Sequence, residues 1–188
     1  MALFRPKAIT QLNEIAKLLY IRSQLLAQLT IERIGKTSAL PERQVEVLHA
    51  GIVSEAIRFR AELRPFEVPS HDLVLRCVLK LVWENYRQTF GRTPMWVEEG
   101  WIRIETFILG RTNMAQPPEG ETVETAVGKE LTLLISRSLN VESNTEALSW
   151  IYTHLMASLT VTPQTLAYTD QIRQIDWRTA KLEKYALS

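Results

Sequence analysis

Cysteine and histidine are scarce, because the 188 residues hold one cysteine, Cys77, and three histidines. One cysteine cannot form an internal disulfide, and a chain of this length can fold without one, so we expect a reducing compartment and a cytoplasmic protein. A structural zinc site needs about four closely spaced Cys or His ligands, and these four residues form no such cluster. Cys77 stands among Val74, Val78 and Leu81, a setting typical of a buried, inert thiol. We therefore expect no metal and no other cofactor.

Catalytic and membrane motifs are missing as well. The seven glycines are scattered along the chain and form no phosphate-binding loop. Charged residues such as Lys17 and Arg22 interrupt the longest apolar stretches, and the first residues do not follow a signal-peptide pattern, so we expect no membrane span. Glu98 and Glu99 have no histidine at metal-binding spacing and fit the first turn of a helix, where carboxylates complement the helix dipole. We expect a protein without enzymatic activity.

Helical periodicity, by contrast, runs along nearly the whole chain. Apolar residues recur every three or four positions, and no run alternates as a half-buried strand does. The expected helices cover residues 8–34, 41–63, 70–90, 94–110, a stretch from 123 past 135, residues 145–159, and a weakly amphipathic segment after Pro163. The expected N-caps are Ser70, a capping box from Ser143 to Glu146, and Thr162. The pattern predicts an all-α fold, a compact bundle of about six or seven helices in one domain spanning residues 1–188, with a long loop near 111–120.

Each expected helix carries an apolar stripe that we assign to the core. The stripe of the third helix is the most regular and consists of Val74, Val78, Val82 and Tyr86. The fourth helix carries Val97, Trp101, Ile104 and Ile108 at the same spacing. The stripes of the first and fifth helices include Leu26, Leu29, Leu131, Leu134 and Ile135.

The net charge is only +1, but the charges are unevenly distributed. Residues 1–92 hold 14 Lys and Arg against 9 Asp and Glu, a balance of +5, whereas residues 93–170 hold 4 against 10, a balance of −6. Arginine outnumbers lysine by 15 to 7, and the planar fork of arginine matches phosphates and carboxylates. Such a chain is predisposed to stack head to tail with its own copies or to dock on a larger basic partner. Ordinary surface ion pairs are the alternative explanation.

A basic line runs along the third expected helix, opposite its core stripe. At 100° per residue, Arg76, Lys80 and Arg87 fall together on that face, and Trp83 stands beside them. Such a line suits a nucleic-acid backbone, with the indole as a platform for a base. The alternative is a solvated helix face with Trp83 packed on a neighbouring helix. The candidate nucleic-acid-binding residues, with the arginines of the preceding helix and of the following loop, are Arg43, Arg60, Arg64, Arg76, Lys80, Trp83, Arg87 and Arg92.

An all-helical, cysteine-poor chain of this size with an arginine-lined helix face resembles the small subunits of class 1 CRISPR effector complexes. It also resembles the related helical C-terminal domain of the large subunit in type I-D systems. In that family, copies line the belly of the complex, contact the backbone of the target strands and touch neighbouring subunits end to end. The resemblance implies a non-enzymatic subunit whose partners are other protein subunits, further copies of itself and single- or double-stranded nucleic acid. It would place on the nucleic acid Arg60, Arg64, Arg76, Lys80, Arg87 and Arg92.

Two other interpretations remain open from the sequence. The first is a protein–protein adaptor or regulatory helical bundle that uses Trp96, Trp101, Trp177 or the last helix. The second is a helical enzyme or ligand carrier with a pocket near Trp150, Tyr152 and His154. Joint exposure of Trp83 and the basic line would favour nucleic acid, whereas a buried Trp83 would leave only an electrostatic track.

Overall fold

The apolar spacing that predicts helices is matched by helices in the computed structural model, which describes residues 6–34, 41–89, 92–112, 119–178 and 180–186. Over those residues the chain forms seven α-helices and one short 3₁₀ helix, with no strand. They are α1 (Lys7–Ile34), α2 (Pro41–Leu63), α3 (His71–Arg87), α4 (Met95–Thr112), α5 (Val123–Ser138), α6 (Thr145–Leu159), α7 (Thr169–Arg173) and η1 (Leu182–Lys184). The prediction of an all-α bundle is confirmed.

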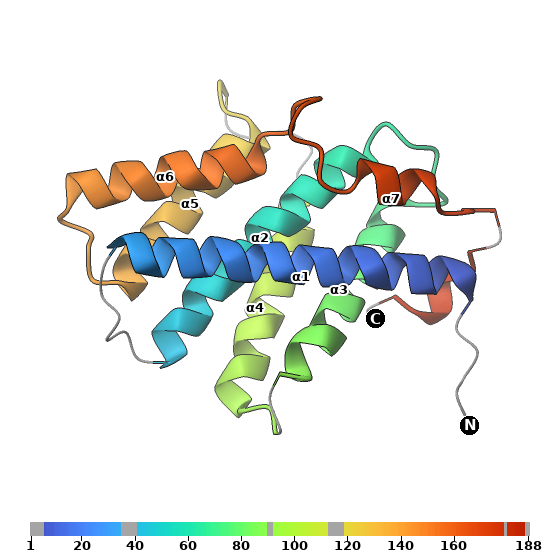
Figure 1. Ribbon diagram of the computed structural model, residues 1–188, viewed down its shortest axis with the longest axis horizontal. Helices are drawn as coiled ribbons and strands as arrows, with labels where there is room; N and C mark the ends of the chain where they lie inside the picture. The colour runs from blue at the N-terminus through green and yellow to red at the C-terminus, as the bar shows by residue number, and fades with distance from the viewer. Residues whose placement is uncertain (1–5, 35–40, 90–91, 113–118, 179, 187–188) are drawn as a thin grey trace.

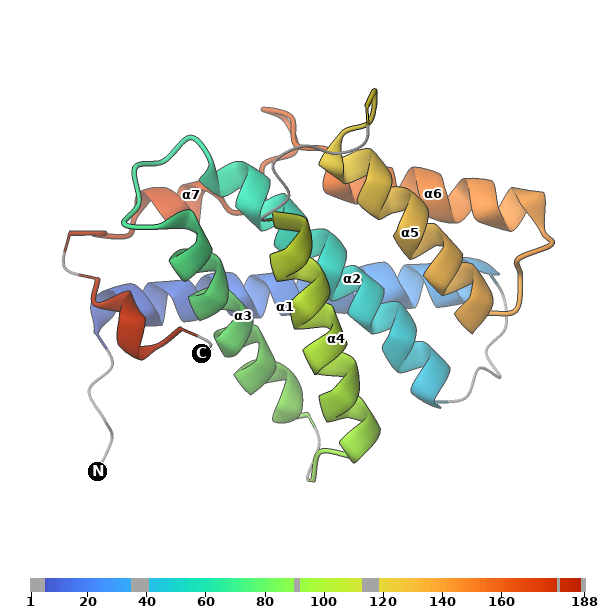
Figure 2. The same ribbon diagram turned by 180° about the vertical axis from the view of Figure 1, so that it is seen from behind.

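Helix α2 lies at the centre of the bundle. It packs against α1 and against α3 to α7, and residues 51–59 are all buried. Helix α1 crosses one side of α2 (Figure 1), and α4 and α5 pack on α2 from the opposite side (Figure 2), while α3 lies beside α2 and also packs on α1. The crossing of α1 over α2 is close, because a Cβ at Gly51 would lie only 2.7 Å from the backbone oxygen of Ser23. Gly51 therefore sets how near the two longest helices approach.

Two leucines that we placed in core stripes lie on the surface instead. Leu29 of α1 is 49% exposed and Leu134 of α5 is 43% exposed. The inward positions of α1 include Ser23 and Thr30, whose buried hydroxyls donate to carbonyl oxygens one turn earlier. The buried face of α1 therefore continues onto a serine and a threonine, so hydrophobicity alone assigns Leu29 to the wrong face. The stripes expected for α3 and α4 are buried along their whole length.

The predicted helix ends agree with the structure in part. Ser70 caps α3, with its hydroxyl oxygen accepting the Leu73 N–H at 3.2 Å. The cap of α6 is Asn144, one residue after the start of the predicted capping box, and its side chain accepts the Ala147 N–H at 3.0 Å. Helix α4 continues through Gly110, where we expected it to stop, as far as Thr112.

The last helix differs most from its prediction. We expected it to begin at Thr162 and Pro163, but turns occupy residues 163–165 and α7 covers only Thr169–Arg173. The expected helix stops at Gly35 and Gly91 lie outside the described residues, as do positions 113–118 of the predicted loop.

The segment containing α7 is held to α2 by the buried carboxylate of Glu62. This side chain accepts the backbone N–H groups of residues 167, 168 and 169 at 2.8–3.1 Å and the hydroxyl of Thr169 at 2.9 Å. Arg58, one turn earlier on α2, pairs with Glu62 at 3.2 Å and donates to the carbonyl oxygen of Ser158. A carboxylate with this many donors is a fully satisfied buried acceptor, so Glu62 and Arg58 join α2 to the end of α6 and the start of α7.

Glu55 makes a second connection from the same helix. Its carboxylate accepts hydrogen bonds from Arg22 Nε of α1 at 2.7 Å, from the Ser158 hydroxyl at 2.7 Å and from the Tyr168 hydroxyl at 2.5 Å. Burial, followed by the neighbouring Glu55 carboxylate, raises the pKa of Tyr168, which stays a neutral donor. Glu55 and Glu62 of α2 therefore both form hydrogen bonds with other parts of the bundle.

Candidate functional site

The predicted stacking platform, Trp83, lies between α3 and α4. Its side chain is half-buried and stacks on Trp101 of α4, with ring centroids 5.1 Å apart and 22° between the ring planes. The ring of Tyr86 packs against it at 5.8 Å. A base can stack only on an aromatic face that solvent reaches, and Trp101 covers one face of this indole. Trp83 therefore joins α4 to α3.

Arg76, at the centre of the predicted basic line, lies close to carboxylates on two helices. Its Nε donates to Asp72 on α3 at 2.8 Å. On α4, burial raises the pKa of Glu105, and the nearby charge of Arg76 opposes that shift. Each carboxylate cancels part of the field of the guanidinium, so Arg76 offers less charge to a phosphate than a solvated arginine does.

The three arginines predicted on α2 lie far apart. Arg43 stands near the N-terminal end of the helix and Arg60 is 17 residues further along, about 25 Å at 1.5 Å per residue. Arg64 is exposed just after the helix ends, whereas Arg60 is half-buried. Burial, followed by the like charge of Arg64, lowers the pKa of Arg60. Arg43 therefore belongs to a different surface from the other two.

The remaining predicted residues follow α3. Lys80 is half-buried on that helix. Arg87 is exposed at its last position, and Arg92 is exposed in the connection to α4. The basic line is therefore solvated mainly at its C-terminal end.

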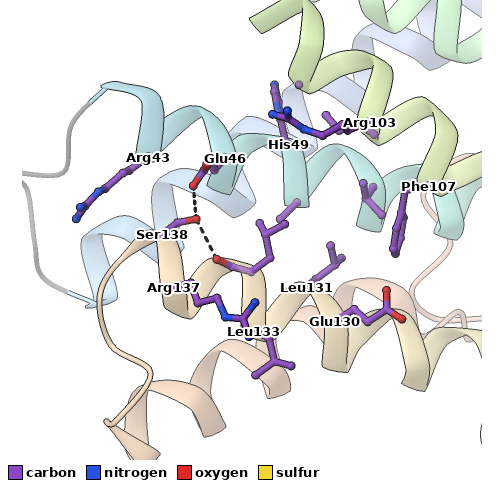
Figure 3. Close-up of a pocket in the computed structure, with 15 residues that line it drawn as sticks. Arg43, Glu46, His49, Arg103, Phe107, Glu130, Leu131, Leu133, Arg137 and Ser138 are labelled. Atoms are coloured by element: carbon purple, nitrogen blue, oxygen red, sulfur yellow. Dashed lines mark hydrogen bonds between the residues drawn. The ribbon is translucent and has the colours of Figure 1, made fainter. Parts of the chain in front are cut away.

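A groove of about 740 Å³ lies between α4 and α5, with α2 as its floor (Figure 3). The floor is built by Glu46, His49, Ala50 and Val53, with Arg43 at one end. The α4 wall consists of Gly100, Arg103, Ile104 and Phe107, and the α5 wall of Glu130, Leu131, Leu133, Leu134, Arg137 and Ser138. Of the predicted binding residues, only Arg43 lines this groove.

The packing of α4 and α5 on α2 explains the groove. Both helices pack on α2, on the same side of it (Figure 2), but they make few contacts with each other. Gly100 allows α4 to pack closely on α2, because a Cβ at this position would lie 2.7 Å from Cε1 of His49. On the opposite wall Leu133 is 51% exposed, and Leu134 beside it is exposed as well. The groove is thus apolar and open to solvent.

His49 on the floor is a neutral polar group. The residue is 8% exposed, and Nε2 is hydrogen-bonded to the hydroxyl of Tyr86 at 3.0 Å. Burial, followed by the nearby charge of Arg103, lowers the pKa of His49 to about 4. His49 therefore carries no charge near neutral pH.

The charged groups of the groove are mostly arginines without a countercharge. In the part of the chain that the structure describes, Arg43, Arg103 and Arg137 form no ion pair and no side-chain hydrogen bond. Arg103 and Arg137 lie on opposite walls (Figure 3). Glu46 accepts the Ser138 hydroxyl at 2.5 Å. Three arginines against Glu46 and Glu130 give the groove a formal charge of +1.

Cys77, Trp150 and His154, which the sequence analysis also discussed, contact other groups of the bundle. Burial raises the pKa of Cys77 to about 11, and its Sγ donates to the carbonyl oxygen of Leu182 at 3.3 Å. On α6 the rings of Trp150 and His154 stack on each other at 4.6 Å.

Over the described ranges, no group of three or more His, Cys, Asp or Glu residues is placed to hold a metal ion. Within the same ranges, no helix combines the length and apolar character needed to cross a membrane.

Sequence reasoning missed this groove, although one signal was present. The stretch from Leu131 to Ile135 holds four large apolar residues in five positions, which is more than one buried stripe of a helix accommodates. The surplus predicts that part of the apolar surface faces solvent or a partner.

Comparison with known proteins adds no relative, since no protein-family model, no curated protein and no solved structure matches this chain.

Proposed function

We propose that this chain is a non-enzymatic adaptor subunit of a multi-subunit complex, and that its groove holds an α-helix of a partner protein. The observation that carries the proposal is the apolar groove between α4 and α5, with Leu133 and Leu134 exposed on one wall. Contiguous exposed apolar surface marks sites of protein contact. An amphipathic helix laid into a hydrophobic groove is a recurrent form of such contact. The single buried thiol, Cys77, fits a reducing compartment such as the cytoplasm.

The length of the groove suits a short helix. Its floor runs from Arg43 to Val53 on α2, which is about 15 Å at 1.5 Å per residue, and its α5 wall from Glu130 to Ser138 is about 12 Å. These lengths correspond to roughly two to three helical turns. A partner helix of that length reaches the floor with apolar side chains at positions i, i+3 or i+4, and i+7.

The apolar side chains of the groove favour a helix over a nucleic-acid strand. Ala50 and Val53 of the floor and Leu131 of the α5 wall have no side-chain donor, so a phosphate placed against them would lose hydration without a replacement hydrogen bond. A helix instead buries its own apolar side chains there, at about 25 cal/mol per Å² removed from water. These contacts support a protein as the proposed partner of the groove.

A second candidate function is backbone contact with nucleic acid, as in the small subunits that the sequence resembles. The observation that favours it is the pair of solvated arginines at the C-terminal end of α3 and just beyond it, Arg87 and Arg92, which lie outside the groove. Titration of labelled single- and double-stranded DNA and RNA by fluorescence anisotropy tests it. We expect affinity that falls steeply with salt and is lost when these two arginines are replaced by alanine. Absence of binding at low salt would contradict this second function.

Site-specific photo-crosslinking in cells that make the protein tests the adaptor function. A benzophenone amino acid replaces Leu133 in the groove and, in a matched control protein, replaces Leu25 on α1, which is 53% exposed. We expect crosslinks from position 133 to one protein, at partner residues spaced three or four apart along a helix. Position 25 should not give that product. Crosslinks from position 133 to nucleic acid, or the same products from both positions, would refute the adaptor function.

A further inference from the structure

We infer that the helix held in the groove is acidic, with carboxylates on both edges of its apolar stripe; this inference rests on the proposed function. The observation behind it is that Arg43, Arg103 and Arg137 line one apolar groove without an ion pair to any described residue. Arg103 and Arg137 are exposed on opposite walls, and Arg43 lies half-buried at one end (Figure 3).

Two other arginines are paired with buried carboxylates. Arg22 pairs with Glu55 at 2.7 Å, and Arg58 pairs with Glu62 at 3.2 Å. The fold therefore supplies a carboxylate where an arginine is needed for its own stability. The three arginines of the groove have no carboxylate partner among the described residues, although Glu46 and Glu130 line the same groove.

The two carboxylates of the groove do not neutralise the three arginines. Glu46 is tied to the hydroxyl of Ser138 at 2.5 Å, and Glu130 stands at the end away from Arg43 (Figure 3). His49 adds no charge near neutral pH, because burial holds its pKa near 4. The groove therefore presents a net positive charge beside its apolar side chains.

The positions of the arginines define the pattern expected in the partner. A helix that inserts its apolar stripe between α4 and α5 brings one edge of the stripe toward Arg103 and the other toward Arg137. Glutamate or aspartate on each edge can meet a guanidinium fork, which binds a carboxylate in two-pronged geometry. Apolar burial then supplies most of the affinity, while the positive charge selects the partner and speeds association.

A displayed library of 15-residue helices tests the inference with the full chain as target. Every member carries leucine along one stripe, and the flanking positions vary among Glu, Gln and Lys. We expect Glu to be enriched over Lys on the wild-type protein and the enrichment to vanish on the double variant Arg103→Gln/Arg137→Gln. It should persist on Arg33→Gln/Arg178→Gln, which removes the same charge at two exposed arginines outside the groove. A selected acidic helix should bind the groove variant about 3- to 10-fold more weakly.

The outcomes separate this inference from the proposed function. Equal recovery of Glu, Gln and Lys helices that all lose binding on Leu133→Glu would refute the acidic partner and keep the helix-binding groove. Failure to select any helix whose binding depends on Leu133 would overturn both. Displacement of the selected helix from the groove by a tighter-binding single-stranded RNA would make nucleic acid the occupant and would also overturn both.

Discussion

Replacement of Glu62 by glutamine tests how the C-terminal segment is held to α2. The carboxylate of Glu62 is fully buried, accepts the backbone N–H groups of residues 167–169 and pairs with Arg58. Glutamine has nearly the same shape, but its NH₂ group turns a donor toward backbone donors. It also leaves the buried guanidinium of Arg58 without its countercharge.

The expected loss of stability is large. Removal of one partner from a buried ion pair costs about 3–5 kcal/mol, because the other charge remains buried and uncompensated. A loss of about 4 kcal/mol is a sizeable part of the roughly 5–15 kcal/mol that stabilises a typical domain. For a chain of this length each kcal/mol shifts Tm by about 2–4 °C, so we expect Tm to fall by about 8–16 °C.

Thermal and urea unfolding followed by circular dichroism measure this loss. Glu67→Gln, a change at an exposed glutamate just beyond α2, is the matched control and should stay within about 0.5 kcal/mol of wild type. Hydrogen exchange should also speed up at the amides of residues 167–169 in the Glu62→Gln variant. A loss below about 1 kcal/mol with unchanged exchange would refute the reasoning, since a buried pair broken on one side must cost more.

Four further changes have expected outcomes that urea unfolding measures. Gly51→Ala should destabilise by about 1–3 kcal/mol, because its Cβ would lie 2.7 Å from the rigid backbone of α1. Gly110→Ala, with no atom within 4 Å of the new Cβ, should stabilise α4 by about 0.5–1 kcal/mol; a loss would contradict the helix boundary. The lowered pKa of His49 means that only the unfolded chain binds this proton between pH 4 and 6.5, so stability should rise by up to about 3 kcal/mol over that range. His49→Gln should reduce this dependence of stability on pH. If the dependence is unchanged in the variant, other titrating groups cause it. Trp83→Ala should lower the free energy of unfolding by about 3 kcal/mol, because the stacking on Trp101 of α4 is lost. An unchanged stability would contradict the packing of this indole against α4.

Periodicity predicts the fold where a helix buries one broad apolar face. Val74, Val78 and Val82 of α3 recur every four residues and are all buried, within a wide face that also buries Leu75 and Leu81. The same rule misplaces Leu29, because the buried face of α1 continues through Leu26 and Thr30 and Leu29 lies outside it.

The binding surface depends even more on tertiary packing. A helical wheel places Trp83 beside Arg76, and that wheel is correct, but it cannot show that Trp101 of α4 covers the indole. Equally, Arg103 and Arg137 stand 34 residues apart in the sequence and come to opposite walls of one groove only because α4 and α5 both pack on α2. The surplus of apolar residues around Leu133 was the part of this site that the sequence could have predicted.

The affinity of the crosslinked partner's helix for three proteins tests the central claim most directly. Isothermal titration compares wild type with Leu133→Glu in the groove and with Leu25→Glu on α1, two leucines of nearly equal exposure. A charge on the groove wall removes an apolar contact of about 1.5–3 kcal/mol, so Leu133→Glu should weaken binding at least about tenfold. Leu25→Glu should stay within about twofold of wild type, because α1 lies on the other side of α2. An unchanged affinity for Leu133→Glu, or an equal loss in both variants, would contradict a helix bound between α4 and α5.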